Sequence, residues 1–156
     1  PFVVPDDIVQ AWRACGGRGR EAARAWDSRP GQRDASSAAE WTRRQAGELP
    51  SGWAAALSAL TKDLAADGPG WATRKSSQEV LEVINATIPE TIGGSADLTG
   101  SNNTRTGGLG IFTARTPDGR YIQYGVREHA KGAVMNGIAL PGGLIPYGGT
   151  HLVFTH

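Results

Sequence analysis

The sequence contains one cysteine, Cys15, and this count excludes a disulfide within a single chain. A reducing compartment is therefore the natural setting, and we expect the cytoplasm. No apolar run approaches the length of a membrane span, so a membrane location is not expected. The 16 basic and 15 acidic residues leave a formal net charge of +1, which gives no indication of a nucleic-acid partner. The local basic run of Arg18, Arg20 and Arg24 is best interpreted as a solvated surface.

Histidine is also scarce, and its placement argues against a metal site. His129 directly follows Glu128, whereas His151 and His156 lie five positions apart with no second acidic residue nearby. Zinc sites in proteins use closely spaced sets of Cys, His and carboxylate ligands. We therefore expect no zinc site in this chain.

What is present divides the chain into two parts. The 156 residues, 39% of them hydrophobic, have the size and balance of one soluble domain. All five tryptophans lie in the first 71 residues, where alanine and arginine predict short helices joined by polar turns. We expect helices at residues 6–13 and 53–66, the second of them stopped by Gly68–Pro69. Residues 18–48 have weak periodicity and predict an irregular connector with helical pieces.

The second part alternates between helical and strand-like patterns. The capping-box pattern Ser76-x-x-Glu79 predicts a helix at residues 77–86, which Pro89 ends. The elements expected after it are a short apolar entry at 91–92, a loop at 93–110, a strand at Tyr121–Tyr124, a helix after Glu128 and a strand at Gly142–Tyr147. This order predicts an α/β fold with a partial parallel sheet and crossover helices, preceded by a helical connector.

Glu128 is the acidic residue with the most informative position. It begins a helical pattern directly after a strand-like run and the turn residue Gly125. Ligands gather at the carboxyl ends of parallel strands, and helix N-termini favour negative charge. Glu128 is therefore either an acid that serves a bound ligand or one that only complements the helix dipole. The pattern alone favours the second interpretation.

Six segments, in a consistent order, resemble the transketolase family. They are PFVVP at Pro1–Pro5, ATRKSSQ at Ala72–Gln78, IGGSADLTGSN at Ile92–Asn102, GRYIQYGVREHA at Gly119–Ala130, MNGIAL at Met135–Leu140, and GGLIPYGGT followed by LVF between Gly142 and Phe154. The resemblance implies a thiamine diphosphate-binding fold. In it, residues 1–70 are a helical or irregular connector, and residues 71–156 are the N-terminal part of a truncated pyrimidine-binding domain.

The resemblance also implies an activity and its partners. A transketolase transfers a two-carbon ketol unit from a ketose phosphate to an aldose phosphate, in the pentose phosphate pathway or the Calvin cycle. The family acts as a homodimer with thiamine diphosphate. The magnesium that bridges the diphosphate is bound by the preceding domain, so the resemblance implies no metal ligand in this chain. The chain starts at Pro1 and stops at His156 within a patterned segment. We therefore expect a piece of a longer protein that is inactive by itself.

Five residues match functional positions of the family, and each also has an ordinary structural interpretation. Glu128 corresponds to the glutamate that hydrogen-bonds the aminopyrimidine ring and acts as its proton partner. Phe154 corresponds to an aromatic residue that stacks on that ring, and it also fits a core position. Arg74 and Ser101 correspond to ligands of the sugar phosphate, and they also fit a solvated cation and a turn residue. Asp97 corresponds to an acid close to the cofactor, and it also fits an Asx-type loop residue.

Four positions depart from the family pattern. Lys131 replaces an apolar residue, Pro141 a histidine, His151 a phenylalanine of the cofactor pocket, and His156 an acid. A buried Lys131 would be costly, or it would pair with the carboxylate of Glu128. The alternative is therefore a non-catalytic, transketolase-like partner subunit or a decayed enzyme. Another thiamine-dependent relative, such as a deoxyxylulose-phosphate synthase, is disfavoured by TRKSSQ and GGSADLTGSN.

Overall fold

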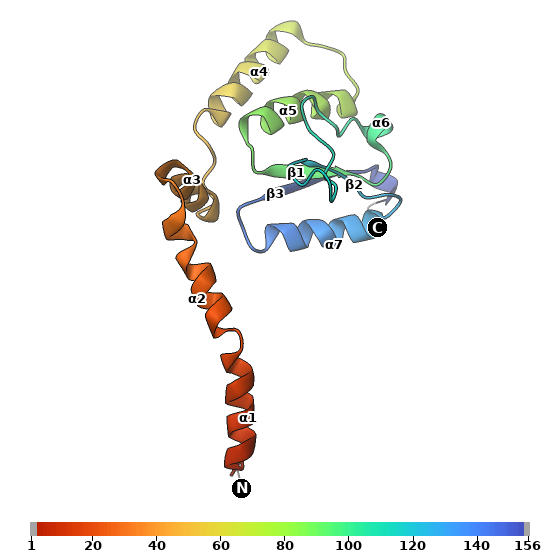
Figure 1. The fold of residues 1–156 in the computed structure, drawn as a ribbon. Coiled ribbons are helices and arrows are strands. Elements are labelled where there is room, and N and C mark those ends of the chain that lie inside the picture. Colours follow the sequence, from red (N-terminus) through yellow and green to blue (C-terminus); the bar gives the residue numbers. More distant parts are fainter. Residues whose placement is uncertain (1–2, 155–156) are drawn as a thin grey trace. The chain divides into compact units, whose positions relative to one another are not determined.

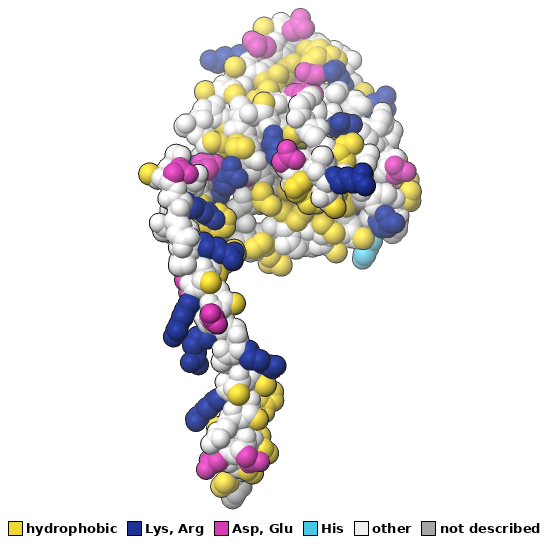
Figure 2. All heavy atoms as spheres, viewed as in Figure 1, with side chains coloured by type: hydrophobic (Ala, Val, Ile, Leu, Met, Phe, Trp, Pro, Cys, Tyr) yellow, Lys and Arg dark blue, Asp and Glu magenta, His cyan; other side chains and the backbone are white. Residues whose placement is uncertain are grey.

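The computed structural model describes residues 3–154, which form two compact units, the first ending at Trp41 and the second beginning at Thr42. The first unit contains helices α1 (Asp6–Gly17) and α2 (Arg20–Ser28) and a 3₁₀ turn, η1 (Pro30–Gln32). Neither helix contains a buried residue. Arg side chains are exposed along this unit (Figure 2), as predicted for the run from Arg18 to Arg24.

The predicted connector at residues 18–48 does contain helical pieces, but they occupy most of this range, so it is more regular than expected. It includes α2 and α3 (Ala35–Gln45). The carboxylate of Asp34 caps α3 by accepting a hydrogen bond of 2.9 Å from the backbone N–H of Ser37. The hydroxyls of Ser36 and Ser37 also donate to it and hold the pKa of Asp34 far below its ordinary value. Asp34, Ser36 and Ser37 thus form the cap of a helix within this range.

The second unit contains the sheet. Its further elements are α4 (Trp53–Asp67), α5 (Thr73–Thr87), β1 (Thr91–Ser95), α6 (Thr99–Asn102), β2 (Tyr121–Gln123), α7 (Glu128–Ala139), β3 (Ile145–Gly149) and the 3₁₀ turn η2 (Leu152–Phe154). The strands are parallel in the order β2-β1-β3, with Ser95 of β1 opposite Gln123 and Gly149. Helices α5 and α7 cover opposite faces of the sheet (Figure 1). The predicted α/β fold with a parallel sheet is confirmed.

Three element boundaries differ from the predictions. Helix α5 begins at Thr73 after an Ala72 N-cap that makes no side-chain hydrogen bond, so the capping box is not formed. Glu79 pairs with Lys75 instead. Strand β1 continues through the glycines of the expected loop, where it pairs with β3. Tyr147 of β3 lies against Gly93, where a Cβ would overlap its ring and carbonyl, so the pairing requires glycine there. Strand β3 begins at Ile145 rather than at Gly142.

A polar cluster replaces part of the apolar core beneath α5. Asn85 is the only residue of α5 that is fully buried. Its amide nitrogen donates to Thr106 Oγ1 at 2.9 Å and to Tyr147 Oη at 3.2 Å, and its oxygen accepts from Thr91 Oγ1 at 2.8 Å. Burial raises the pKa of Tyr147. The cluster ties α5 to β1, β3 and the loop that follows α6.

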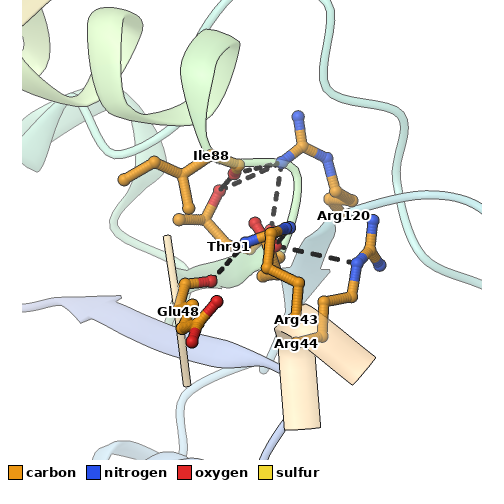
Figure 3. A network of polar contacts seen from close by, with 7 residues as sticks. Arg43, Arg44, Glu48, Ile88, Thr91 and Arg120 are labelled. Carbon is orange, nitrogen blue, oxygen red and sulfur yellow. Dashed lines mark hydrogen bonds and ion pairs between the residues drawn. The ribbon is translucent and has the colours of Figure 1, made fainter. Parts of the chain in front are cut away.

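Charged groups connect the end of α3 to the turn before β1. The buried carboxylate of Glu90 pairs with Arg43 and lies 3.6 Å from Nε of Arg44. On the other side of the turn, Arg120 donates to the carbonyl oxygens of Asn85, Ile88 and Thr91. Figure 3 shows the guanidinium groups around this turn. Because Glu90 precedes β1 directly, the network fixes where that strand starts.

Among the helices of residues 3–154, none combines the length and the apolar character that crossing a membrane requires.

Candidate functional site

The carboxyl edge of the sheet gathers the predicted site residues. Asp97 and Ser101 follow β1, Glu128 follows β2, and Phe154 follows β3. Arg74 lies in the first turn of α5, which leads into β1, so the helix N-terminus lies over the carboxyl end of the strand. In open parallel sheets this edge is where ligands bind.

Glu128 is held by the turn between β2 and α7. Gly125 has a φ of 65°, which favours glycine, and it reverses the chain after the strand. Arg127 is the N-cap of α7, and its carbonyl oxygen accepts a hydrogen bond of 2.8 Å from the backbone N–H of Lys131. Glu128 is therefore the first helical residue, and it is half-buried. The predicted strand-to-helix junction is confirmed.

Glu128 and Phe154 line one pocket of about 390 Å³. The other lining residues are His129, Lys131, Gly132, Ala133, Asn136 and Thr150. Phe154 is 41% exposed, so its ring is available to a ligand rather than enclosed in a core. The pocket thus combines a carboxylate with an aromatic face.

Lys131 forms the buried floor of this pocket. Its side chain is almost fully buried, and Nζ donates a hydrogen bond of 2.6 Å to the carbonyl oxygen of Gly149. Burial lowers the pKa of Lys131, and the nearby Glu128 carboxylate opposes part of that effect. Of the two predicted outcomes for Lys131, the structure thus gives a buried ammonium that hydrogen-bonds the end of β3.

A second pocket, of about 480 Å³, contains Arg74. It is lined by Thr73, Arg74, Ser77, Asn102, Thr104, Gly148, Gly149, Thr150, His151 and Leu152. This lining holds one guanidinium, one imidazole and several hydroxyl and amide groups, but no carboxylate. Hydrogen-bond donors without an opposing negative charge suit an anion.

Ser101 borders the second pocket through His151. Its Oγ donates to the carbonyl oxygen of Leu98 at 3.0 Å and lies 3.4 Å from Nε2 of His151. Asp97 is not brought to either pocket. It is exposed, and its φ of 63° is the left-handed conformation that Asp tolerates in loops.

Thr150 was not predicted from the sequence, although it joins the two pockets. It lines both of them, and its Oγ1 atom is buried without a hydrogen-bond partner among the described residues. Buried hydroxyls normally have a partner, so this atom is suited to one supplied by a ligand. The only signal in the sequence is its place directly after the strand-forming run that ends at Gly149.

Within residues 3–154, no group of three or more His, Cys, Asp or Glu side chains is placed to hold a metal ion.

Comparisons with known proteins agree with this arrangement. The model of the family "Transketolase, pyrimidine binding domain" matches residues 70–156. The chain is 44% identical over 155 residues to a transketolase of Rhodobacter capsulatus and 46% identical over 158 residues to transketolase 1 of Vibrio cholerae. Both alignments cover 99% of this chain but only 23% and 24% of those relatives.

Solved structures show the same relation. A transketolase from Leishmania mexicana matches with a TM-score of 0.79 and 37% identity, over 98% of this chain and 22% of that one. A Pichia stipitis transketolase in complex with sedoheptulose 7-phosphate matches with a TM-score of 0.76 and 38% identity, over 98% and 23%. The chain thus spans about a quarter of the length of its relatives, and it belongs to the transketolase family, whose pyrimidine-binding domain residues 70–156 match.

Proposed function

We propose that this chain supplies part of the active site of a thiamine diphosphate-dependent transketolase. The reaction is transfer of a two-carbon ketol unit from a ketose phosphate to an aldose phosphate. The observation that carries the proposal is the shared pocket of Glu128 and Phe154, which adjoins the Arg74 pocket at Thr150. One pocket suits a flat ring with basic nitrogens, and the other suits an anionic group.

The residues of the first pocket fit the aminopyrimidine of the cofactor. When bound, thiamine diphosphate supplies the carbon nucleophile for the ketol transfer. Glu128 holds or releases a proton at its carboxylate, opposite a ring nitrogen, and the half-buried position strengthens that hydrogen bond. The Phe154 ring orients the pyrimidine by stacking. The unpartnered Thr150 hydroxyl offers a further hydrogen bond to the bound group.

The second pocket orients the sugar phosphate. Arg74 offers a planar set of donors to the phosphate group, and Ser101 holds the loop wall beside it. Asp97 is assigned to the cofactor side of the loop by its match to the family motif only. In this proposal residues 71–156 are the N-terminal part of the pyrimidine-binding domain, and residues 1–70 are its connector. The complete enzyme is a cytoplasmic homodimer in which the preceding domain binds the diphosphate and its magnesium.

A second candidate function is favoured by one observation, the buried ammonium of Lys131 beside Glu128. A positive charge at this depth disfavours the proton sharing that Glu128 performs in the first proposal. The second candidate is a non-catalytic subunit that keeps the pockets but does not activate the cofactor.

One chimera separates the two candidates. The 155 matched residues of the Rhodobacter capsulatus transketolase are exchanged for this chain, and ketol transfer from xylulose 5-phosphate is measured together with thiamine diphosphate binding by equilibrium dialysis. We expect turnover that falls by at least about 100-fold in Glu128→Gln, with Glu21→Gln on the exposed surface of α2 as the matched control. A folded chimera that binds the cofactor without turnover would instead establish the non-catalytic function. If it does not bind the cofactor at all, the assignment of the pocket that Glu128 and Phe154 line fails.

A further inference from the structure

Asn102 lines the Arg74 pocket, and buried neighbours fix the orientation of its side chain. It is the last residue of α6 and is itself buried. Its Oδ1 atom accepts a hydrogen bond of 2.8 Å from Oγ1 of Thr104, and its Nδ2 atom donates one of 3.0 Å to Oγ of Ser95. Thr104 and Ser95 are also buried. The amide group of Asn102 is therefore held on both sides.

A directed chain of hydrogen bonds connects this amide to strand β2. Thr104 has one hydroxyl proton, which it donates to Asn102, so its oxygen accepts from Oη of Tyr121 at 3.0 Å. Tyr121 also has one hydroxyl proton, and its oxygen then accepts from Oγ1 of Thr99 at 2.6 Å. Tyr121 is a fully buried residue of β2. The segment that carries Asn102 is thus anchored to the sheet.

One hydrogen-bond donor of Asn102 is left for a bound molecule. The Nδ2 atom carries two N–H groups, and among the residues that the structure describes only Ser95 accepts a hydrogen bond from it. Gly149, which lines the same pocket, leaves space beside this nitrogen, because a Cβ at Gly149 would lie 3.0 Å from Nδ2. Asn102 can therefore donate one further hydrogen bond without giving up either of its present partners.

The chemistry of the pocket indicates what accepts this hydrogen bond. The lining contains the Arg74 guanidinium and no carboxylate, so it favours an anion. Phosphate oxygens are strong hydrogen-bond acceptors. We propose that Asn102 is a further phosphate-binding residue of this pocket and donates its free N–H to an oxygen of the sugar phosphate. The inference rests on the proposed function of the Arg74 pocket. Arg74 supplies charge, and Asn102 supplies a donor whose direction is fixed by the fold.

The experiment follows the side-chain amide signals of Asn102 by nitrogen–proton correlation NMR of the 156-residue chain. Xylulose 5-phosphate is added in one titration, and xylulose, which lacks the phosphate, is added in the other. We expect the signal of the free N–H to move with the phosphorylated sugar, while the signal of the N–H that Ser95 accepts moves little. Xylulose should leave both signals unchanged, because a neutral sugar has no group for the anion pocket.

Two substitutions separate ligand binding from a structural role. Asn102→Ala removes the donor, and the dissociation constant of xylulose 5-phosphate should rise about tenfold, as for one hydrogen bond to a charged group. Asn102→Asp keeps the shape of the side chain and can accept hydrogen bonds from both Thr104 and Ser95. It replaces the free donor by a negative charge, so binding should be weaker still than in Asn102→Ala. A purely structural role predicts the reverse order.

The controls distinguish the inference from the proposed function. Arg74→Leu should abolish binding, and Gln123→Ala, which removes an exposed amide that lines neither pocket, should change nothing. If the unchanged chain binds the sugar phosphate no more tightly than xylulose, or if Arg74→Leu has no effect, the phosphate site is refuted and the inference with it. If Arg74→Leu abolishes binding but Asn102→Ala or Asn102→Asp binds as tightly as the unchanged chain, only the role of Asn102 is refuted. A circular dichroism spectrum establishes that each variant is folded.

Discussion

The Nζ atom of Lys131 lies 2.6 Å from the carbonyl oxygen of Gly149, and this hydrogen bond joins the first turns of α7 to the end of β3. The two elements carry the two sides of the pocket that Glu128 and Phe154 line, since Glu128 begins α7 and Phe154 follows β3. Lys131 therefore has a structural task in this chain. If Glu128 shares a proton with the cofactor while Lys131 keeps this hydrogen bond, the catalytic function is correct. If it does not, the non-catalytic function is correct.

The first prediction concerns the pH dependence that Lys131 gives to stability. Burial lowers the pKa of Lys131 in the folded chain below the value of about 10.4 that lysine has when unfolded. Between these two values the unfolded state binds more protons than the folded state, so stability rises with pH in this window. In urea unfolding, the free energy of unfolding of the unchanged chain should therefore increase relative to that of Lys131→Met as the pH rises from neutrality toward about 10.

The matched control is Lys62→Met on the exposed surface of α4. It should show no comparable change with pH. Parallel pH profiles for the unchanged chain and Lys131→Met would show that the ammonium of Lys131 is not buried as described.

The second prediction contrasts a buried ion pair with an exposed one. Glu90→Gln removes the carboxylate that pairs with Arg43, where the Glu90 side chain is only 4% exposed. Removing one partner of a buried pair leaves a charge without compensation, and we expect a loss of about 3 kcal/mol in the free energy of unfolding. Glu79→Gln is the control, because the Lys75 and Glu79 side chains are 43% and 30% exposed. It should cost less than about 0.5 kcal/mol in the same urea titration, and equal losses would show that the Glu90 network does not fix β1.

The third prediction compares a glycine that has a positive φ in a turn, Gly125, with a glycine inside a helix, Gly137. Gly125 has a φ of 65°, and an added Cβ would come within 2.5 Å of Nη1 of Arg127. Gly125→Ala should therefore destabilise the chain by about 1–2 kcal/mol and reduce the cofactor affinity of the chimera, because it displaces Glu128. Gly137 lies inside α7 with no atom within 4 Å of an added Cβ. Gly137→Ala should stabilise the chain by about 0.5–1 kcal/mol without affecting the cofactor, and the reverse order would contradict the described turn.

The features that were predicted correctly from the sequence are those encoded locally. The strand, the turn at Gly125 and the helix from Glu128 follow one another within a few residues, so periodicity and one glycine suffice. The end of α4 at Gly68 was predicted for the same reason, and its φ of 54° confirms it. The Asp34 cap of α3 is local as well, but the weak periodicity of residues 18–48 did not indicate the helix that it begins.

The features that were missed depend on contacts between distant segments. Asn85 is buried because Thr106 and Tyr147 supply its partners, 21 and 62 positions away. A polar residue on a helix gives no sign of such partners, so the burial of Asn85 was not predicted. The pairing of Ser95 with Gly149 likewise places Thr150 between the two pockets. The position of Thr150 depends on the register of the parallel strands β1 and β3, which cannot be read from the sequence.

The last prediction tests whether Phe154 acts on the cofactor or on the fold. Phe154 is 41% exposed and lines the pocket, so Phe154→Leu removes a stacking face but keeps an apolar side chain at this position. We expect the free energy of unfolding of the 156-residue chain to change by less than about 0.5 kcal/mol. In the chimera, thiamine diphosphate should bind about three- to tenfold more weakly, which is the loss expected for one aromatic contact. Val153→Ala is the matched control, because that side chain is 73% exposed and lines neither pocket. A large loss of stability in Phe154→Leu with unchanged cofactor affinity would show that Phe154 packs in the fold and does not contact the cofactor. Glu128 and Thr150 would then be the residues of the pocket that contact the ligand.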